Sequence, residues 1–251
     1  MIQVTCTQSV ATITLQRGKV NAMNLDFCDQ LIQTLDQIEQ LPVQECRATI
    51  LKGNERVFSA GIDLKQWLDE PPTYVEPFML KLEELFQRVF SFKKPIVACM
   101  HGAAIAGGCM LAAACDFRVL GPAAQMGILE SRLGVPLPMT AIEIMRHVAN
   151  PNAFRQITSV GATFVGQAAV DAGLADKCVD NESLLSAASA AADELAAIPP
   201  AAFQLTKLQR TEPVLRIVEQ NRIQLLARYL EIWNSPETRD AIRQYVDERL
   251  R

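Results

Sequence analysis

Hydrophobic and polar residues alternate along the first part of the chain in the manner of β-strands. The alternation predicts a hairpin of Ile2–Thr7 and Val10–Leu15 that turns at Gln8 and Ser9. Short, almost continuous apolar runs further along predict buried strands. These runs are Ala48–Leu51, Ile96–Met100 and Phe117–Leu120.

Between these strands the apolar residues recur at helical spacing. Asn24 is placed to cap a helix whose apolar face begins at Leu25 and Cys28. Val75–Phe90 has the same spacing and is followed by Lys94-Pro95, which ends the pattern. Helices that alternate with strands predict an α/β core.

Beyond residue 139 nearly every segment has the periodicity of a helix, with prolines at 199, 200 and 213 as predicted breaks. We expect a core domain over residues 1–195 and a helical C-terminal region over residues 196–251. The predicted helices are Thr140–Val148, Gly166–Ala172, Asn181–Ala197, Pro200–Leu208, Val214–Trp233 and Glu237–Leu250.

Composition narrows the class of protein. The 251 residues suit one large domain, or one domain with an appendage, and the formal net charge of -4 argues against a nucleic-acid or anionic-membrane partner. Seven cysteines without CxxC spacing are typical of reduced thiols, and no signal peptide or membrane-length apolar run is visible. We therefore expect a cytoplasmic protein. Two histidines and scattered cysteines give no metal-ligand spacing.

The segment HGAAIAGGCMLAAACD, residues 101–116, follows a predicted strand and contains three glycines. A helix that begins at Gly107 would expose N–H groups without internal partners, and these bind anions or developing negative charge. The alternative is that the glycines and alanines only allow close packing of the helix on the sheet.

A second glycine turn, VFSAGIDLK at residues 57–65, places another N–H group beside a helix that Asp63 is able to cap. Two N–H donors on separate loops are what an oxyanion hole requires. By itself this segment is equally consistent with an ordinary strand-to-helix turn.

Together the two turns resemble the enoyl-CoA hydratase/isomerase (crotonase) superfamily. Further matching segments are GKVNAM at 18–23, PIVA at 95–98, CDFR at 115–118, GILESRLGVP at 127–136 and AAVDAGLA at 168–175. The resemblance implies a spiral of ββα repeats with a helical C-terminal trimerisation region, and a homotrimer or a dimer of trimers. It also implies that the N–H groups of Ile62 and Gly107 bind the thioester oxygen of an acyl-CoA.

Two positions indicate which reaction of the superfamily applies. The hydratases carry one glutamate in the pattern AGGCE and another in PExxLG, since hydration needs two acid–base groups. This chain has Met110 at the first position and Glu130 at the second. One carboxylate suits a proton shuttle, and the pattern resembles mitochondrial-type Δ3,Δ2-enoyl-CoA isomerases. We predict a 3-enoyl-CoA to 2-enoyl-CoA isomerase in which Glu130 moves the proton and the oxyanion hole stabilises the dienolate.

The remaining site predictions concern binding. Lys19 and Ala22 lie in the segment 18–23, which resembles a CoA-proximal loop. Arg17 and Lys19 are candidates for contact with the CoA phosphates and are equally consistent with an ordinary charged loop, and Ala60 is a family-based candidate for backbone contact with adenine. Coenzyme A would enter as part of the substrate, with no other cofactor and no metal. The candidates for the acyl pocket, which are equally consistent with core residues, are Trp67, Leu68, Phe78, Met110 and Leu137.

Alternatives remain open at this stage. Glu130 beside Arg132 has the pattern of a surface ion pair, and Glu143 is a rival carboxylate. A triad of Ser59, His101 and Asp116 lacks a GxSxG elbow. Other functions are hydration, hydrolysis or decarboxylation of an acyl-CoA, isomerisation of ring-derived CoA esters, and non-catalytic acyl-CoA binding.

Overall fold

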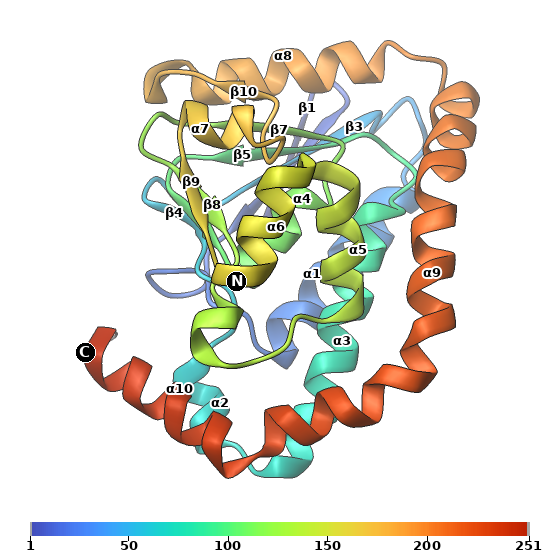
Figure 1. The fold of residues 1–251 in the computed structure, drawn as a ribbon. Helices are drawn as coiled ribbons and strands as arrows, with labels where there is room; N and C mark the ends of the chain where they lie inside the picture. Colours follow the sequence, from blue (N-terminus) through green and yellow to red (C-terminus); the bar gives the residue numbers. More distant parts are fainter. Residues whose placement is uncertain (1, 250–251) are drawn as a thin grey trace.

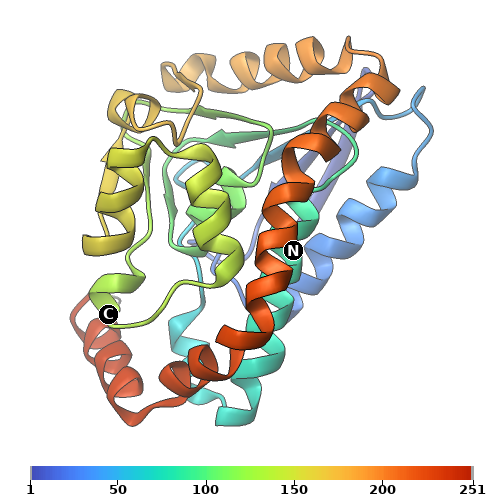
Figure 2. The same ribbon diagram turned by 45° about the vertical axis from the view of Figure 1, so that its right-hand side comes forward.

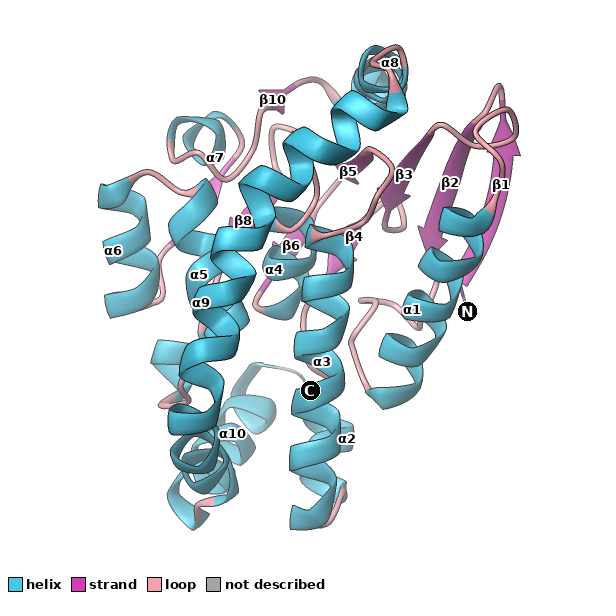
Figure 3. Cartoon of the chain, turned by 90° about the vertical axis from the view of Figure 1, so that its right-hand side faces the viewer, coloured by secondary structure: helices cyan, strands magenta, loops and turns pink. Residues whose placement is uncertain are grey.

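The structure, a computed structural model, describes residues 2–249 without the side chain of residue 223, and it is built around a twisted six-stranded sheet (Figure 3). The strand order is β1-β2-β3-β5-β7-β10, in which β1 is antiparallel to β2 and the other neighbours are parallel. The strands are β1 (Ile2–Thr7), β2 (Val10–Leu15), β3 (Ala48–Lys52), β5 (Ile96–Met100), β7 (Phe117–Leu120) and β10 (Lys177–Cys178).

A second sheet, in the order β4-β6-β8-β9, consists of three-residue strands too short to give a sequence signal. The first repeat places both of its strands, β1 and β2, in the large sheet. In each of the next three repeats the first strand joins the large sheet and the second joins the small sheet, and a helix follows. This arrangement confirms the predicted α/β fold of ββα repeats. The short strands are β4 (Val57–Ser59), β6 (Ala103–Ile105), β8 (Gln125–Gly127) and β9 (Thr163–Val165).

Helices cover both faces of the large sheet (Figure 1). Leu51 of β3 faces the core cluster with α1 (Leu25–Gln40) and α3 (Val75–Phe90), whereas the adjacent Ile50 packs against α8 (Leu184–Ala196). The Asn24 side chain accepts the N–H of Phe27 at 2.9 Å and so caps α1. The remaining helices of the core are α2 (Leu64–Asp69), α4 (Gly107–Ala113), α5 (Met139–Val148), α6 (Pro151–Val160), α7 (Gln167–Asp171) and the 3-10 turns η1 (Pro72–Tyr74), η2 (Glu130–Leu133) and η3 (Asn181–Ser183).

The C-terminal region differs from the prediction at Pro213. One helix, α9 (Pro200–Asn234), runs through that proline and descends along the side of the molecule, and α10 (Pro236–Arg249) turns back upward from its lower end (Figure 2). The predicted break is therefore wrong, because packing on both sides of residue 213 offsets the cost of an internal proline. The predicted end of the last helix at Leu250 lies outside the described residues. No helix within residues 2–249 is both long and apolar enough to cross a membrane.

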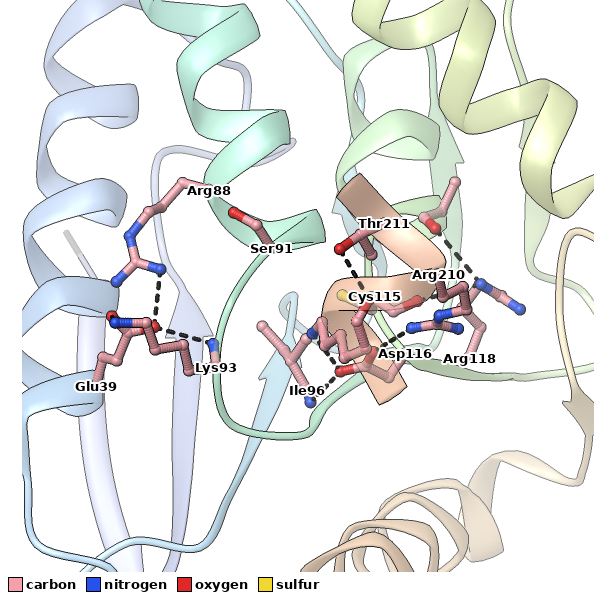
Figure 4. Close-up of polar contacts among 12 residues, drawn as sticks. Glu39, Arg88, Ser91, Lys93, Ile96, Cys115, Asp116, Arg118, Arg210 and Thr211 are labelled. Carbon is pink, nitrogen blue, oxygen red and sulfur yellow. Dashed lines mark hydrogen bonds and ion pairs between the residues drawn. The ribbon is translucent and has the colours of Figure 1, made fainter. Parts of the chain in front are cut away.

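The upper part of α9 is held by a buried carboxylate at the end of α4. Asp116 Oδ2 accepts from the ammonium of Lys207 at 2.7 Å and from the N–H of Ile96 at 3.0 Å, and Oδ1 accepts from Arg210 at 2.6 Å (Figure 4). This cluster joins α9 to the first residue of β5. Because α9 is fixed at this end, its lower end has a defined place over the core.

Candidate active site

A cavity of about 700 Å³ lies where the two glycine turns, η2 and the C-terminal helices meet. That size is ordinary for a small-molecule site. Its walls come from four segments of the core and from the last two helices. The lining residues are Arg17, Gly18, Lys19, Val20, Ala22, Ala60, Ile62, Asp63, Leu64, Lys65, Ile105, Ala106, Leu129, Glu130, Leu133, Val135, Trp233 and Tyr245.

The first glycine turn presents the N–H of Ile62. Met23 donates to the carbonyl of Gly61 at 2.7 Å and accepts from the N–H of Asp63 at 2.8 Å, in a parallel bridge. The N–H of Ile62, between these two contacts, therefore points to the opposite side of the segment. Gly61 has a φ of +85°, and a Cβ there would lie 2.9 Å from the nitrogen of Gly107. Glycine at this position lets the two turns approach each other.

The second glycine turn places the N–H of Gly107 at the start of α4. Ala106 precedes it with a φ of +54°, which is unfavourable for a residue with a Cβ, and donates its N–H to the carbonyl of Gly127 at 2.9 Å. A Cβ on Gly108 would lie 2.1 Å from the carbonyl oxygen of Ser59, so only glycine permits this packing. The structure thus brings the predicted donors of Ile62 and Gly107 into neighbouring turns.

Glu130 begins η2 and lines the cavity, although its residue is only 7% exposed. Burial raises the pKa of this carboxyl to about 7, and backbone hydrogen bonds at Glu130 and Leu129 oppose part of that rise. Its Oε2 has no hydrogen-bond partner among the described residues. A carboxyl with this pKa is able both to accept and to return a proton near neutral pH. The surface ion pair with Arg132 is not found, because the Arg132 guanidinium donates to the carbonyl of Val160.

The other acid on the cavity wall is already paired. Asp63 binds the guanidinium of Arg17 at 2.8 Å and caps α2 by accepting the N–H of Gln66 at 3.1 Å. Met110, at the position of the first hydratase glutamate, is buried in the apolar core. Among the lining residues that the structure describes, Glu130 is therefore the one acid without a counter-charge.

Basic side chains stand at the same cavity. The guanidinium of Arg17 is already paired within the protein: it binds Asp63 at 2.8 Å and donates to the carbonyl of Ala22 at 2.8 Å. Lys19 is exposed, as is Lys65, which the sequence analysis did not single out. Neither lysine has an ion-pair partner within the part of the chain that the structure describes. These two are the cations best placed for phosphate groups, and Arg17 instead fixes the loop that carries Lys19.

None of the five residues predicted for the acyl pocket is on the cavity wall; they are Trp67, Leu68, Phe78, Met110 and Leu137. Trp67, Phe78 and Met110 are buried in the core, and Leu68 and Leu137 pack against it.

The apolar wall comes instead from Leu133, Val135, Trp233 and Tyr245. The two aromatic residues are about one hundred residues from Glu130 in sequence, so no local motif connects them with the site. The cover over the site thus belongs to α9 and α10 of the same chain.

The rival constellations do not assemble. Ser59 donates its hydroxyl to the carbonyl of Asn21 at 2.7 Å, and Asp116 is paired with Lys207, so neither is available to His101. Glu143 pairs with Arg146 at 3.3 Å on α5 and is not on the cavity wall. No cluster of three or more histidine, cysteine or acidic residues suited to a metal occurs among the described residues.

Comparison with known proteins decides the family. The family model described as "Enoyl-CoA hydratase/isomerase" matches residues 5–250. The chain belongs to this family. The human mitochondrial enoyl-CoA delta isomerase 1 is 30% identical over 215 residues, which cover 84% of this chain and 70% of that protein. A probable enoyl-CoA hydratase of Bacillus subtilis (strain 168) is 28% identical and covers 99% of this chain and 96% of its own.

Solved structures of the family have the same fold. The human mitochondrial delta3-delta2-enoyl-CoA isomerase superimposes with a TM-score of 0.93 at 25% identity, covering 98% of this chain and 97% of that one. A probable enoyl-CoA hydratase of Mycobacterium tuberculosis H37Rv gives a TM-score of 0.86 at 30% identity and covers 93% and 98%. Members of the enoyl-CoA hydratase/isomerase family with both kinds of name are thus similar to this chain at comparable identity.

Proposed function

We propose that the protein is an enoyl-CoA isomerase that moves a 3,4 double bond into conjugation with the thioester. The observation that carries the proposal is the single buried carboxylate without a counter-charge, Glu130, in a cavity whose other acid is bound to Arg17. Hydration would need a second group to hold water or supply a proton. Met110 offers neither, since it is apolar and buried.

In the proposed reaction, the Glu130 carboxylate removes a proton from C2 of the 3-enoyl thioester. The electron pair shifts into a dienolate, whose oxygen accepts hydrogen bonds from the N–H groups of Ile62 and Gly107. Each such donor typically contributes about 3 kcal/mol to the transition state. The same carboxyl then returns the proton at C4, which gives the 2-enoyl thioester and restores the charged Glu130.

The binding part of the proposal places coenzyme A along the polar wall. Lys19 and Lys65 would meet its phosphates, and Ala22 and Ala60 would offer backbone groups beside them. The acyl group would lie on the apolar side beyond Glu130. No cofactor other than the CoA of the substrate takes part in this scheme.

We further propose assembly into a homotrimer or a dimer of trimers. Leu205 and Leu208 leave 59% and 53% of their surface exposed on the upper part of α9, which a partner subunit would cover. Light scattering on the wild type and on Leu208→Glu tests this assembly. A wild-type protein that is monomeric at micromolar concentration contradicts it.

The test of the reaction follows conversion of trans-3-hexenoyl-CoA to the conjugated thioester, with hydration of 2-hexenoyl-CoA measured beside it. We expect isomerisation without hydration. Glu130→Gln should abolish both turnover and exchange of the C2 proton with deuterated water. Glu143→Gln is the matched control, because that buried acid lies outside the cavity, and it should retain activity.

The outcomes separate the competing functions. Hydration by the wild type would mean that a group other than Met110 supplies the second function. Unchanged turnover in Glu130→Gln would overturn the role of Glu130. Release of free CoA from either substrate would identify a hydrolase.

A further inference from the structure

One wall of the cavity includes an aromatic residue that is almost completely buried. Trp233, in the last turn of α9, lines the cavity, yet only 2% of the residue is exposed. Its indole N–H donates to the carbonyl of Pro136 at 3.3 Å, one residue beyond the cavity-lining Val135. Because its ring is hydrogen-bonded to the segment that carries Glu130, Trp233 belongs to the site as well as to the packing of α9.

Two further aromatic rings hold the same indole from behind. Trp67 meets it edge-to-face at 5.8 Å between centroids with 70° between the planes, and Tyr229 lies one turn earlier on α9 at 6.1 Å. We call these three residues, Trp233, Trp67 and Tyr229, the aromatic wall. Edge-to-face and tilted pairs of this kind favour one orientation of the ring.

A residue of α10 also restrains the aromatic wall. The guanidinium of Arg239 on α10 lies 4.8 Å from the Trp67 ring. It also donates to the carbonyls of Leu68 and Glu70 at the C-terminal end of α2. A long acyl chain bound in the cavity therefore cannot displace Trp233 without separating α9 and α10 from α2. Interiors packed in this way resist deformation.

The space behind Trp233 is buried and is filled mainly by aromatic rings; its polar groups include the Tyr229 hydroxyl and the Trp67 indole N–H. Tyr229 contacts the sulfur of Met79 through its hydroxyl at 3.4 Å, and Trp67 is itself 1% exposed. Neither Tyr229 nor Trp67 reaches the cavity. Removal of the indole would thus extend the cavity toward the buried rings of Trp67 and Tyr229.

We infer that Trp233 sets the depth of the acyl site and restricts the protein to acyl chains that end before this ring. The inference rests on the proposed function for the acyl-CoA, but not on the isomerisation itself. A chain that stops short of Trp233 gains affinity with each added methylene, because each one buries apolar surface. A chain that would pass the ring finds no space and gains nothing.

The experiment measures equilibrium binding of saturated acyl-CoAs, from butanoyl-CoA to dodecanoyl-CoA in steps of two carbons, by calorimetry. For the wild type, affinity should rise about fourfold per methylene up to a limiting length and then level off or fall. Trp233→Ala should move that limit by about two to four carbons, and Trp233→Phe by less, since the removed bulk equals several methylene groups.

Tyr229→Phe is the matched control. The variant keeps the ring that packs on Trp233 and removes only the hydroxyl, which contacts Met79 away from the cavity, so its binding profile should equal that of the wild type. If Trp233→Ala does not fold, Trp233→Phe still tests the inference through its smaller shift. The same limiting length in the wild type and both Trp233 variants would overturn it.

Failure of the proposed function gives a different result. If no acyl-CoA binds to the wild type, the acyl-CoA function itself is wrong. If acyl-CoAs bind with a shifted limit in Trp233→Ala while 3-hexenoyl-CoA is not isomerised, the depth of the site is supported and only the reaction is wrong.

Discussion

Two carboxylates in this protein are almost equally buried, and their surroundings are opposite. The side chain of Asp116 is 4% exposed and has three donors, from Lys207, Arg210 and the backbone of Ile96. Glu130, in a residue 7% exposed, has an oxygen without any partner among the described residues. A buried charge costs free energy unless it is paired. Asp116 meets this requirement with its partners, whereas Glu130 has no counter-charge.

The two carboxylates differ in what they contribute: Asp116 holds the fold together, whereas Glu130 is the candidate acid–base group. At Asp116 the pairing satisfies the charge and joins α9 to the core, at the price of leaving that carboxylate inert. At Glu130 burial raises the pKa to about 7 without an ion-pair partner to oppose the rise, and the carboxyl lines the cavity. Burial alone does not mark a candidate catalytic acid, whereas burial without a partner, beside a cavity, does.

The largest expected effect comes from Glu130→Gln. The amide keeps the shape of the carboxyl but cannot move a proton, so we expect kcat for 3-hexenoyl-CoA to fall at least about 10³-fold. The free energy of unfolding should not fall at neutral pH. Steady-state kinetics together with urea unfolding checks both parts, and a loss of activity caused by unfolding would remove the contrast with Asp116.

The second largest effect is expected at Lys207, where a substitution should lower the stability of the fold and leave the activity of the folded protein unchanged. Lys207→Met leaves Asp116 without its most buried partner, and we expect the free energy of unfolding to fall by about 3–5 kcal/mol. Activity per folded molecule should remain, because Lys207 is distant from the cavity wall. Urea denaturation, with kcat measured below the transition, provides the test; unchanged stability would show that the pair is dispensable.

A third, smaller effect concerns pH. The pKa of Glu130 is about 7 in the folded protein against 4.5 for an unperturbed glutamate, so the folded state binds more protons between these values. Stability should therefore fall as pH rises from about 4.5 to 7, by about 3 kcal/mol from this group. Unfolding curves of the wild type and Glu130→Gln across this range should converge at low pH and separate at high pH.

The same group predicts the pH dependence of the reaction. The base form of Glu130 is required first, so kcat/KM should increase about tenfold per pH unit below about 7 and level off above it. A profile that is flat between pH 5 and pH 8 would contradict the assigned pKa.

The smallest effect is expected at the rim of the Asp116 cluster. Arg210 is 43% exposed on its side chain, so its ion pair with Asp116 is partly screened by solvent. We expect Arg210→Gln to lower the free energy of unfolding by only about 1 kcal/mol. A loss as large as that of Lys207→Met would show that exposure does not distinguish the two partners.

Patterns between near neighbours in the chain already determined much of this protein. The limits of α3 and β5 were predictable because an amphipathic repeat and a continuous apolar run depend on adjacent residues. The cap at Asn24 and the helix start at Gly107 were local as well. Glu130 stood out because Met110 replaces the first carboxylate of a recognisable motif pair.

Only the tertiary structure decided how distant segments meet. Pro213 has the local signature of a helix end, yet α9 continues through it, because contacts to the core hold both of its halves. Trp67 and Trp233 are both apolar aromatic residues at helical spacing. Nothing in the sequence shows that Trp233 faces the cavity while Trp67 stands behind it. The sequence by itself therefore determined most of the longer elements and singled out Glu130 as the candidate acid. The wall of the site and the partner of Asp116 depended on long-range packing, which no local pattern encodes.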